Sequence, residues 1–194
     1  MDRVTLLFWT LVSLLLGLSA FYGVSAEQQR ARLSSSQSVI LHNGDLVQLL
    51  KVLDGDTLQV ARPGEDPVQV RLIDIKAFDA KVEKDAATPF AQATLAALEH
   101  MTSGQPLRVQ LLPDRNQDRY GRWLATLYAG PQDLALSLLQ RGLVLVYPVY
   151  PFPALPLYFQ AQEQARARHA GFWANPTVTV RAHTLLKTWQ TQAE

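Results

Sequence analysis

The feature that most constrains the fold of this chain is a pair of runs, at residues 52–61 and 68–75, in which apolar and polar residues alternate. Alternation with a period of two is typical of β-strands that bury one face. The residues R-P-G-E-D at positions 62–66 lie between the runs and are turn formers, with a proline and a glycine side by side. The sequence therefore predicts a β-hairpin with a polar loop.

Charged side chains mark the ends of this predicted hairpin: Asp54, Asp56, Arg71, Lys76 and Asp79. Two acids stand at its start, one arginine lies inside its second strand, and a lysine and an acid follow where that strand ends. Acids beside an arginine at strand ends have the chemistry to bind a cation and a phosphate. A second hairpin carries Arg122 in the sequence D-R-Y-G-R, and this residue would complete a clamp of two arginines.

The rest of the chain adds further strands and several helices. We predict strands at residues 46–53, 57–61, 68–75, 107–112 and 122–128, and helices at residues 86–101, 134–141 and 157–169. Beyond residue 175 the pattern supports only a short helix at residues 183–192. Five short strands with an inserted helix are typical of a closed Greek-key barrel of the OB type. The predicted fold is therefore α+β and mainly β, a five-stranded OB-type barrel with about three packed helices.

An apolar segment at residues 4–21 bears on the cellular localisation of the chain. Roughly 18 apolar residues is the lower limit for spanning a bilayer, and V-S-A at residues 24–26 also fits a signal-peptidase site. We therefore predict a signal peptide or membrane anchor at residues 1–26, a linker at 27–37, a domain at 38–175 and a tail at 176–194. Both alternatives predict an exported protein, periplasmic or extracellular, that residues 4–21 would anchor to the membrane if they are retained.

The composition excludes several classes of site. The chain has no cysteine, so disulfides, thiolate metal sites and cysteine nucleophiles are excluded. Its four histidines are scattered without the spacing of zinc ligands, and no haem or nucleotide site is predicted. The net charge is only +1, whereas domains that bind nucleic acid mainly through their overall charge are strongly basic. Binding of nucleic acid would have to rest on a local site.

Six short motifs occur in order between residues 39 and 175: V-L-D-G-D-T at 52–57, R-L at 71–72, an acid eight residues after Arg71, D-R-Y-G-R at 118–122, L-L-Q-R-G-L at 138–143 and A-x-A-R-x-x-G-x-W at 165–173. Each motif is short, but their common order makes the pattern specific. In these motifs the chain resembles the staphylococcal nuclease (thermonuclease-like) family, whose members have an OB-fold barrel with three helices. The resemblance implies calcium-dependent hydrolysis of the phosphodiester bonds of DNA and RNA.

The resemblance also implies a role for individual residues. By position, Asp56 would be a calcium ligand, and Arg71 and Arg122 would hold the phosphate and stabilise the charge that develops in the transition state. Asp79 would orient or deprotonate the attacking water. The substrate-binding positions that the resemblance implies are Arg119 and Tyr120, for terminal phosphate and nucleotide, and Tyr150, for the base pocket.

The sequence departs from the family pattern at two positions of one segment, because Lys76 replaces an aspartate and Asp79 is one methylene shorter than the family's glutamate. The family reads R-L-x-x-I-D-x-P-E, and this chain reads R-L-I-D-I-K-A-F-D at residues 71–79. Lys76 therefore stands at the second calcium carboxylate, and an ammonium group cannot ligate calcium, which takes oxygen ligands. Lys76 would act instead as a fixed positive charge between Asp56 and Asp79, or it would neutralise an inactive site. Asp74 is an alternative metal ligand, although alternation from Arg71 predicts that it faces the opposite side of the strand.

Two functions stay open on these residues. The first is an exported nuclease with an altered metal site, in which calcium is the one cofactor to consider and nucleic acid is the partner. The second is a catalytically inactive module that binds nucleic acid, an envelope polymer or a protein. Both would act as a monomer, and restoring an aspartate at position 76 should create calcium dependence if the remaining machinery is intact.

Overall fold

A computed structural model describes residues 2, 39–79, 82, 84–112, 116–148 and 152–193. The chain divides into two units, Met1–Val39 and Ile40–Glu194, and the second unit holds the fold described below. The predicted export segment at residues 4–21 and the predicted base-pocket residue Tyr150 lie outside the described residues. Among the helices of the described part, none combines the length and apolar character needed to cross a bilayer.

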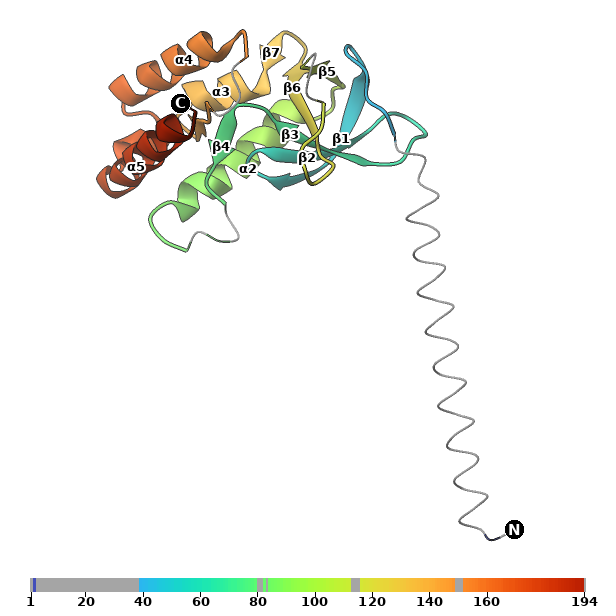
Figure 1. Cartoon of the computed structure of the whole chain (residues 1–194), viewed down its shortest axis with the longest axis horizontal. Coiled ribbons are helices and arrows are strands. Elements are labelled where there is room, and N and C mark those ends of the chain that lie inside the picture. Colours follow the sequence, from blue (N-terminus) through green and yellow to red (C-terminus); the bar gives the residue numbers. More distant parts are fainter. Residues whose placement is uncertain are drawn as a thin grey trace. The chain divides into compact units, whose positions relative to one another are not determined.

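Five strands form a closed barrel, as the alternating runs predicted (Figure 1). They are β1 (Leu46–Asp54), β2 (Thr57–Ala61), β3 (Val68–Leu72), β5 (Leu107–Leu111) and β6 (Trp123–Ala129). Their order is β3-β2-β1-β5-β6, and a parallel pairing between β3 and β6 closes the sheet on itself. Closure removes the exposed strand edges that would otherwise pair with other chains.

The predicted third strand at residues 68–75 is wrong at its end. β3 stops at Leu72, and a separate strand β4 (Ile75–Ala77) pairs antiparallel with β8 (Val144–Val146) outside the barrel. Between them Asp74 has a φ of 57°, a left-handed conformation that turns the chain away from β6. The period-two alternation counted from Arg71 therefore does not apply to Asp74 or to the residues that follow it.

The described residues form four α-helices beside the barrel, where the sequence predicted about three. They are α2 (Thr88–Thr102), α3 (Leu134–Gln140), α4 (Leu155–Ala167) and α5 (Pro176–Ala193), and a 3-10 turn, η1 (Gly171–Ala174), precedes the last. A two-residue strand, β7 (Gln132–Asp133), leads into α3. Figure 1 shows α3, α4 and α5 gathered on one side of the barrel. The last helix begins seven residues before the short helix that the sequence pattern supported.

Two hydrophobic cores hold these elements. The larger fills the barrel and the inner faces of α2, α3 and α4. The smaller consists of Phe78, Ala87, Ala91, Leu145, Ala165, Phe172, Trp173, Val178 and Ala182. It joins the start of α2, strand β8 and helix α5, and it buries the two aromatic residues of η1. Burial of these apolar side chains fixes α5 against the domain.

Candidate active site at the turn between β1 and β2

Asp56 occupies the tight turn between β1 and β2 and is almost fully buried, with 3% of its surface exposed. Its Oδ2 accepts a hydrogen bond of 3.1 Å from the backbone N–H of Ala77 in β4, and its Oδ1 accepts one of 3.3 Å from the hydroxyl of Thr57. Gly55 permits this contact between turn and strand, because a Cβ there would lie 2.5 Å from the Cβ of Ala77. The close packing of the turn on β4 thus fixes the carboxylate of Asp56.

Two cationic side chains meet this carboxylate. The Nη1 of Arg71 forms an ion pair with Oδ1, and the Nζ of Lys76 lies 3.6 Å from Oδ2. Arg71 is nearly buried, whereas half of the Lys76 side chain is exposed. Burial raises the pKa of Asp56, but the charges of Arg71 and Lys76 together with hydrogen bonds hold that pKa below its ordinary value. Asp56 is therefore an anion at neutral pH.

Arg71 uses several of its donors inside the protein. Besides the ion pair, Nη1 donates to the backbone C=O of Asp56 at 3.2 Å, and Nη2 donates to the C=O of Ile75 at 2.8 Å. A guanidinium group has five N–H donors. The described contacts use three of them, so two are left with which Arg71 could meet a phosphate.

Arg122 approaches Asp56 and Thr57 from the other hairpin. The carboxylate of Asp118 accepts from the backbone N–H of Tyr120 at 2.9 Å and of Arg122 at 3.0 Å, and it also accepts from Nε of Arg122 at 2.8 Å. These bonds aim the guanidinium at β2, where its Nη1 donates to the hydroxyl of Thr57 at 3.2 Å. The two arginines of the predicted clamp thus contact neighbouring residues, Asp56 and Thr57. Thr57 links them; it closes the motif V-L-D-G-D-T, but the sequence analysis assigned it no role.

Arg119 and Tyr120 stand at the exposed tip of the same turn. Tyr120 is 68% exposed, the guanidinium of Arg119 lies 4.8 Å from the centroid of its ring, and that of Arg122 lies 5.5 Å away. The Nη2 of Arg119 also donates to the hydroxyl of Tyr120 at 2.7 Å. An exposed ring with two guanidinium groups beside it has the chemistry to stack on a base and to meet a phosphate.

Asp79 lies two residues after Ala77, whose N–H binds Asp56. Two residues of chain span at most about 7 Å, so Asp79 stays at the Asp56 end of the barrel. Asp79 is half-buried, and its backbone C=O accepts from the N–H of Val82 at 3.2 Å. The candidate water-activating residue therefore lies within two residues of the contact between Ala77 and Asp56, on the segment between β4 and α2.

Two further acids lie close to the site. The Oδ1 of Asp54 accepts from the backbone N–H of Asp56 at 3.0 Å, and burial followed by the charge of Asp56 raises the pKa of Asp54. Asp74 is 4% exposed, and neither of its carboxylate oxygens accepts a hydrogen bond from a described residue. Burial raises the pKa of Asp74 to about 7, against a smaller opposing effect of Arg71.

The residues around Asp56 do not fit the calcium site that the family resemblance implies. Calcium takes six to eight oxygen ligands, whereas each oxygen of Asp56 faces a cationic side chain. Within the described ranges, no group of three or more His, Asp or Glu side chains is arranged to hold a metal ion. A calcium ion at Asp56 would have to displace Lys76 or Arg71 first.

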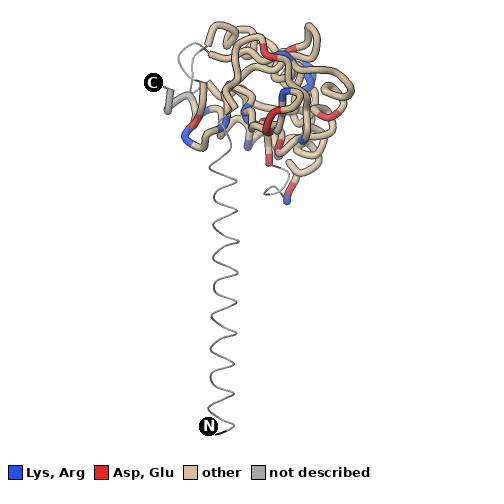
Figure 2. The backbone as a smooth tube through the Cα atoms, turned by 90° about the vertical axis from the view of Figure 1, so that its right-hand side faces the viewer, with Lys and Arg blue, Asp and Glu red and all other residues tan. Residues whose placement is uncertain are grey.

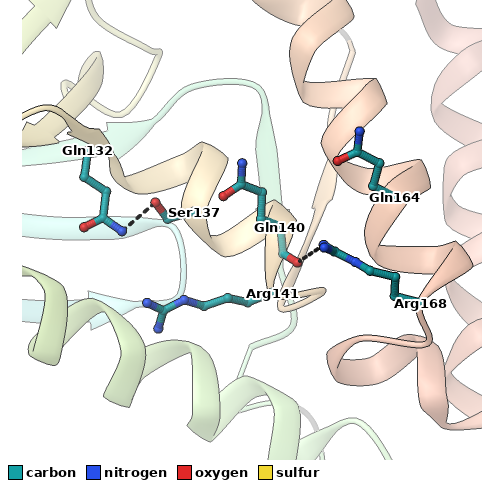
Figure 3. Close-up of a pocket in the computed structure, with 6 residues that line it drawn as sticks. All are labelled: Gln132, Ser137, Gln140, Arg141, Gln164 and Arg168. Carbon is teal, nitrogen blue, oxygen red and sulfur yellow. Dashed lines mark hydrogen bonds between the residues drawn. The ribbon is translucent and has the colours of Figure 1, made fainter.

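A separate polar cavity of about 430 Å³ lies between the ends of α3 and α4 (Figure 3). It is lined by Gln132, Ser137, Gln140, Arg141, Gln164 and Arg168. Arg141 and Arg168 are the residues at which the two helices end, where a cation is favourable, and Arg168 donates to the C=O of Gln140. Among the described residues, none of the predicted site residues lines this cavity. Figure 2 shows basic and acidic positions interspersed along the chain, in keeping with the small net charge.

A closed five-stranded barrel that brings Arg71 to the buried carboxylate of Asp56 and Arg122 to the adjacent Thr57 defines a class of small barrel proteins with a candidate phosphate site. Residues 69–175, more than half of the chain, match the family described as staphylococcal nuclease homologue. The chain belongs to this family, and the predicted family resemblance is confirmed.

Three relatives illustrate the likeness. A Haemophilus influenzae protein named "Uncharacterized endonuclease" is 34% identical over 128 residues, which cover 66% of this chain and 66% of that protein. The thermonuclease of Staphylococcus intermedius is 29% identical over 133 residues, or 67% of this chain and 77% of the relative. Protein ParB of Escherichia coli is 27% identical over 138 residues, or 66% and 72%. The chain thus spans just under two thirds of the length of the Haemophilus protein.

Proposed function

We propose that this chain hydrolyses phosphodiester bonds of nucleic acid, and that fixed protein cations around Asp56 take the place of the calcium ion that the family resemblance implies. The observation that carries the proposal is the position of Lys76, whose Nζ lies 3.6 Å from Asp56 Oδ2 while Arg71 pairs with Oδ1. The names of the endonuclease and thermonuclease relatives support the reaction class. Lys76 supplies one positive charge at this position and ligates no water.

In the proposed reaction, Arg71 and Arg122 hold the phosphate group to be cleaved. Guanidinium groups match the geometry of phosphate oxygens, and donors fixed in advance stabilise the charge that develops in the transition state. Asp79 orients the attacking water and accepts its proton. The water oxygen forms a bond to phosphorus, the bond to the ester oxygen of the next nucleotide breaks, and that oxygen takes a proton from solvent water as it leaves, while Asp79 later returns its proton to solvent.

Arg119 and Tyr120 are proposed to hold the neighbouring nucleotide. The ring of Tyr120 is exposed and lies beside Arg122, so a base stacked on it would bring its own phosphate near the two arginines. Tyr150 remains a predicted part of the base pocket.

One observation favours the inactive binding module as the second candidate. Three donor contacts of Arg71 are already made within the protein, to the carboxylate and the C=O of Asp56 and to the C=O of Ile75. If these contacts persist when a ligand binds, Arg71 completes the structure of the turn and adds little to phosphate binding. The barrel would then use Arg119, Tyr120 and Arg122 to bind nucleic acid, an envelope polymer or a protein without cleavage.

The experiment that decides between these functions is hydrolysis of single-stranded DNA by the full chain, with calcium and with EDTA. The informative variants are Lys76→Asp, Arg71→Lys and Arg122→Lys, and Arg166→Gln is the control because its partner Glu163 is a surface neighbour on α4. We expect wild-type cleavage that is indifferent to EDTA. Losing the planar fork of either arginine should lower kcat about 100-fold or more, the cost of removing one donor to a transition-state oxyanion.

Other outcomes contradict this proposal in distinct ways. Wild-type activity that requires calcium would show that a metal ion displaces Lys76 from Asp56. An inactive wild type with calcium-dependent cleavage by Lys76→Asp would identify a nuclease scaffold that has lost catalysis. Inactivity of every variant, combined with DNA binding that Arg122→Lys weakens, would support the binding module.

A further inference from the structure

Arg181, on α5, touches both ends of the segment that begins beside Asp79. Its Nη1 lies 3.0 Å from Asp85 Oδ2, and its Cζ lies 5.4 Å from the centroid of the Phe78 ring. Phe78 directly precedes Asp79, and Asp85 lies just before α2, so one guanidinium group contacts a described residue on each side of Asp79 in the chain. Arg181 and Asp85 are 96 residues apart in the chain. Arg181 also lies beyond residue 175, where the match to the family ends.

The chain entering this segment is itself held firmly. Phe78 is 4% exposed, and its ring meets that of Phe172 edge-on, with centroids 5.3 Å apart. The N–H of the preceding residue, Ala77, donates to the carboxylate of Asp56. Asp79 therefore follows one residue that is fixed by the site and one that is fixed by the smaller core. Arg181 restrains the same segment at Asp85, beyond Asp79.

Helix α5 is well placed to hold this contact. Val178, which lies one helical turn before Arg181, and Ala182, the residue after it, are both buried in the smaller core. Further along α5, the ring of Trp189 meets that of Tyr147 edge-on, with centroids 5.0 Å apart. Tyr147 directly follows β8, so α5 contacts the chain on both sides of the β4–β8 pair.

We infer that Arg181 is a positioning residue of the hydrolytic site, which restrains the segment carrying Asp79 through Phe78 and Asp85. The inference rests on the proposed function, in which Asp79 orients the attacking water. In that function Arg71 and Arg122 bind the phosphate from other elements. Loosening residues 78–85 should therefore lower kcat and leave KM nearly unchanged, because misplacing a catalytic group weakens only interactions of the transition state.

The test compares the full-length wild type with Arg181→Gln and Asp85→Asn. The asparagine keeps the oxygen that accepts from the N–H of Ala87, so only the charge that pairs with Arg181 is lost. Arg166→Gln on α4 removes a comparable surface ion pair and is the matched control. Hydrogen–deuterium exchange of peptides covering residues 78–87 reports the restraint, and steady-state cleavage of single-stranded DNA reports kcat and KM.

We expect exchange in residues 78–87 to be about three to ten times faster in Arg181→Gln, because a half-exposed ion pair and a cation–π contact are both lost. kcat should fall by a similar factor at constant KM. Asp85→Asn should show part of both effects, Arg181→Lys should recover part of them, and Arg166→Gln should show neither.

Unchanged exchange in residues 78–87 would overturn the inference, and so would faster exchange with an unchanged kcat. Faster exchange across all of the smaller core would also overturn it, since Arg181 would then support the fold and not this segment. An inactive wild type would refute the proposed function instead. The exchange difference would then decide by itself whether Arg181 restrains the segment.

Discussion

At the scale of single residues, Asp74 carries an acidic side chain in surroundings that do not favour its charged form. Its carboxylate is buried, neither oxygen accepts a hydrogen bond from a described residue, and its backbone has a φ of 57°. A buried carboxylate without donors favours the protonated form. Burial raises its pKa from 3.8 to about 7. The folded protein therefore holds a proton on Asp74 over a pH range in which the unfolded chain has released it.

We predict that Asp74→Asn removes a pH dependence of stability. Because the pKa in the folded state is the higher one, the wild type loses stability as pH rises from about 4 to about 7. A difference of about three pH units corresponds to at most about 4 kcal/mol of unfolding free energy. Asparagine keeps the shape and tolerates a left-handed φ. The variant should thus be about 2–4 kcal/mol more stable than the wild type at pH 8 and nearly equal to it at pH 4.

Urea unfolding at both pH values measures this difference. Asp66→Asn is the control, because Asp66 is exposed in the loop between β2 and β3 and should show no such change. A stabilisation of Asp74→Asn that is the same at pH 4 and pH 8 would contradict the prediction and would point to a packing effect.

At the scale of elements, the barrel strands could be predicted because their local pattern agrees with their burial. The predicted strands at residues 57–61 and 107–112 match β2 and β5 to within one residue. The pattern failed at residues 73–74, where the alternation continues but the chain leaves the barrel to pair with β8. The pairing of β4 with β8 depends on a partner strand about 70 residues away, so no local sequence signal predicts it.

The site residues divide in the same way. The placement of Arg71 and Arg122 beside the turn between β1 and β2 could be predicted, because each lies on a hairpin whose turn residues are visible in the sequence, and their catalytic roles stay predictions. The contacts of Thr57 with Arg122 and of Arg181 with Asp85 could not be predicted, because they join residues 65 and 96 positions apart in the chain. The start of α5 was missed as well, because residues 176–182 bury only small or β-branched side chains, Val178 and Ala182, against the smaller core.

Two motif glycines join elements that are distant in sequence. Gly142 ends the α3 turn and Gly171 begins η1, and each has a positive φ. The N–H of Phe172 donates to the C=O of Gly142 at 3.0 Å, and a Cβ on Gly171 would lie 2.1 Å from that same oxygen. The late family motif therefore needs glycine at position 171 for two reasons: the backbone there has a positive φ, and the backbone of Gly142 lies too close for a side chain.

We predict that Gly171→Ala lowers the unfolding free energy by about 3 kcal/mol or more. A left-handed alanine costs about 1–2 kcal/mol, and forcing apart two packed backbones adds about 1–3 kcal/mol. Gly104→Ala is the matched control, because Gly104 also has a positive φ, of 71°, but open space around its Cβ position. Equal losses in the two variants, measured by urea unfolding, would show that the backbone contact contributes nothing beyond conformation.

At the scale of the whole molecule, charge is nearly balanced, and four cations gather at one site beside acids that pair with three of them. The chain carries a net charge of +1, yet Arg71, Lys76, Arg119 and Arg122 gather at one end of the barrel and its adjoining turn. Association with nucleic acid releases counterions in proportion to the phosphates that are neutralised. A balanced molecule with four local cations should therefore show a shallow salt dependence.

We predict that the logarithm of the affinity for single-stranded DNA falls with the logarithm of salt concentration with a slope no steeper than about −3, the value for four phosphate contacts at roughly 0.7 each. Fluorescence anisotropy in EDTA measures it. Arg122→Gln should make the slope shallower by about 0.7, whereas Arg166→Gln should leave it unchanged. A slope steeper than about −5 would contradict a local site. It would require basic residues elsewhere, such as Arg141 and Arg168 at the polar cavity, to bind the same strand.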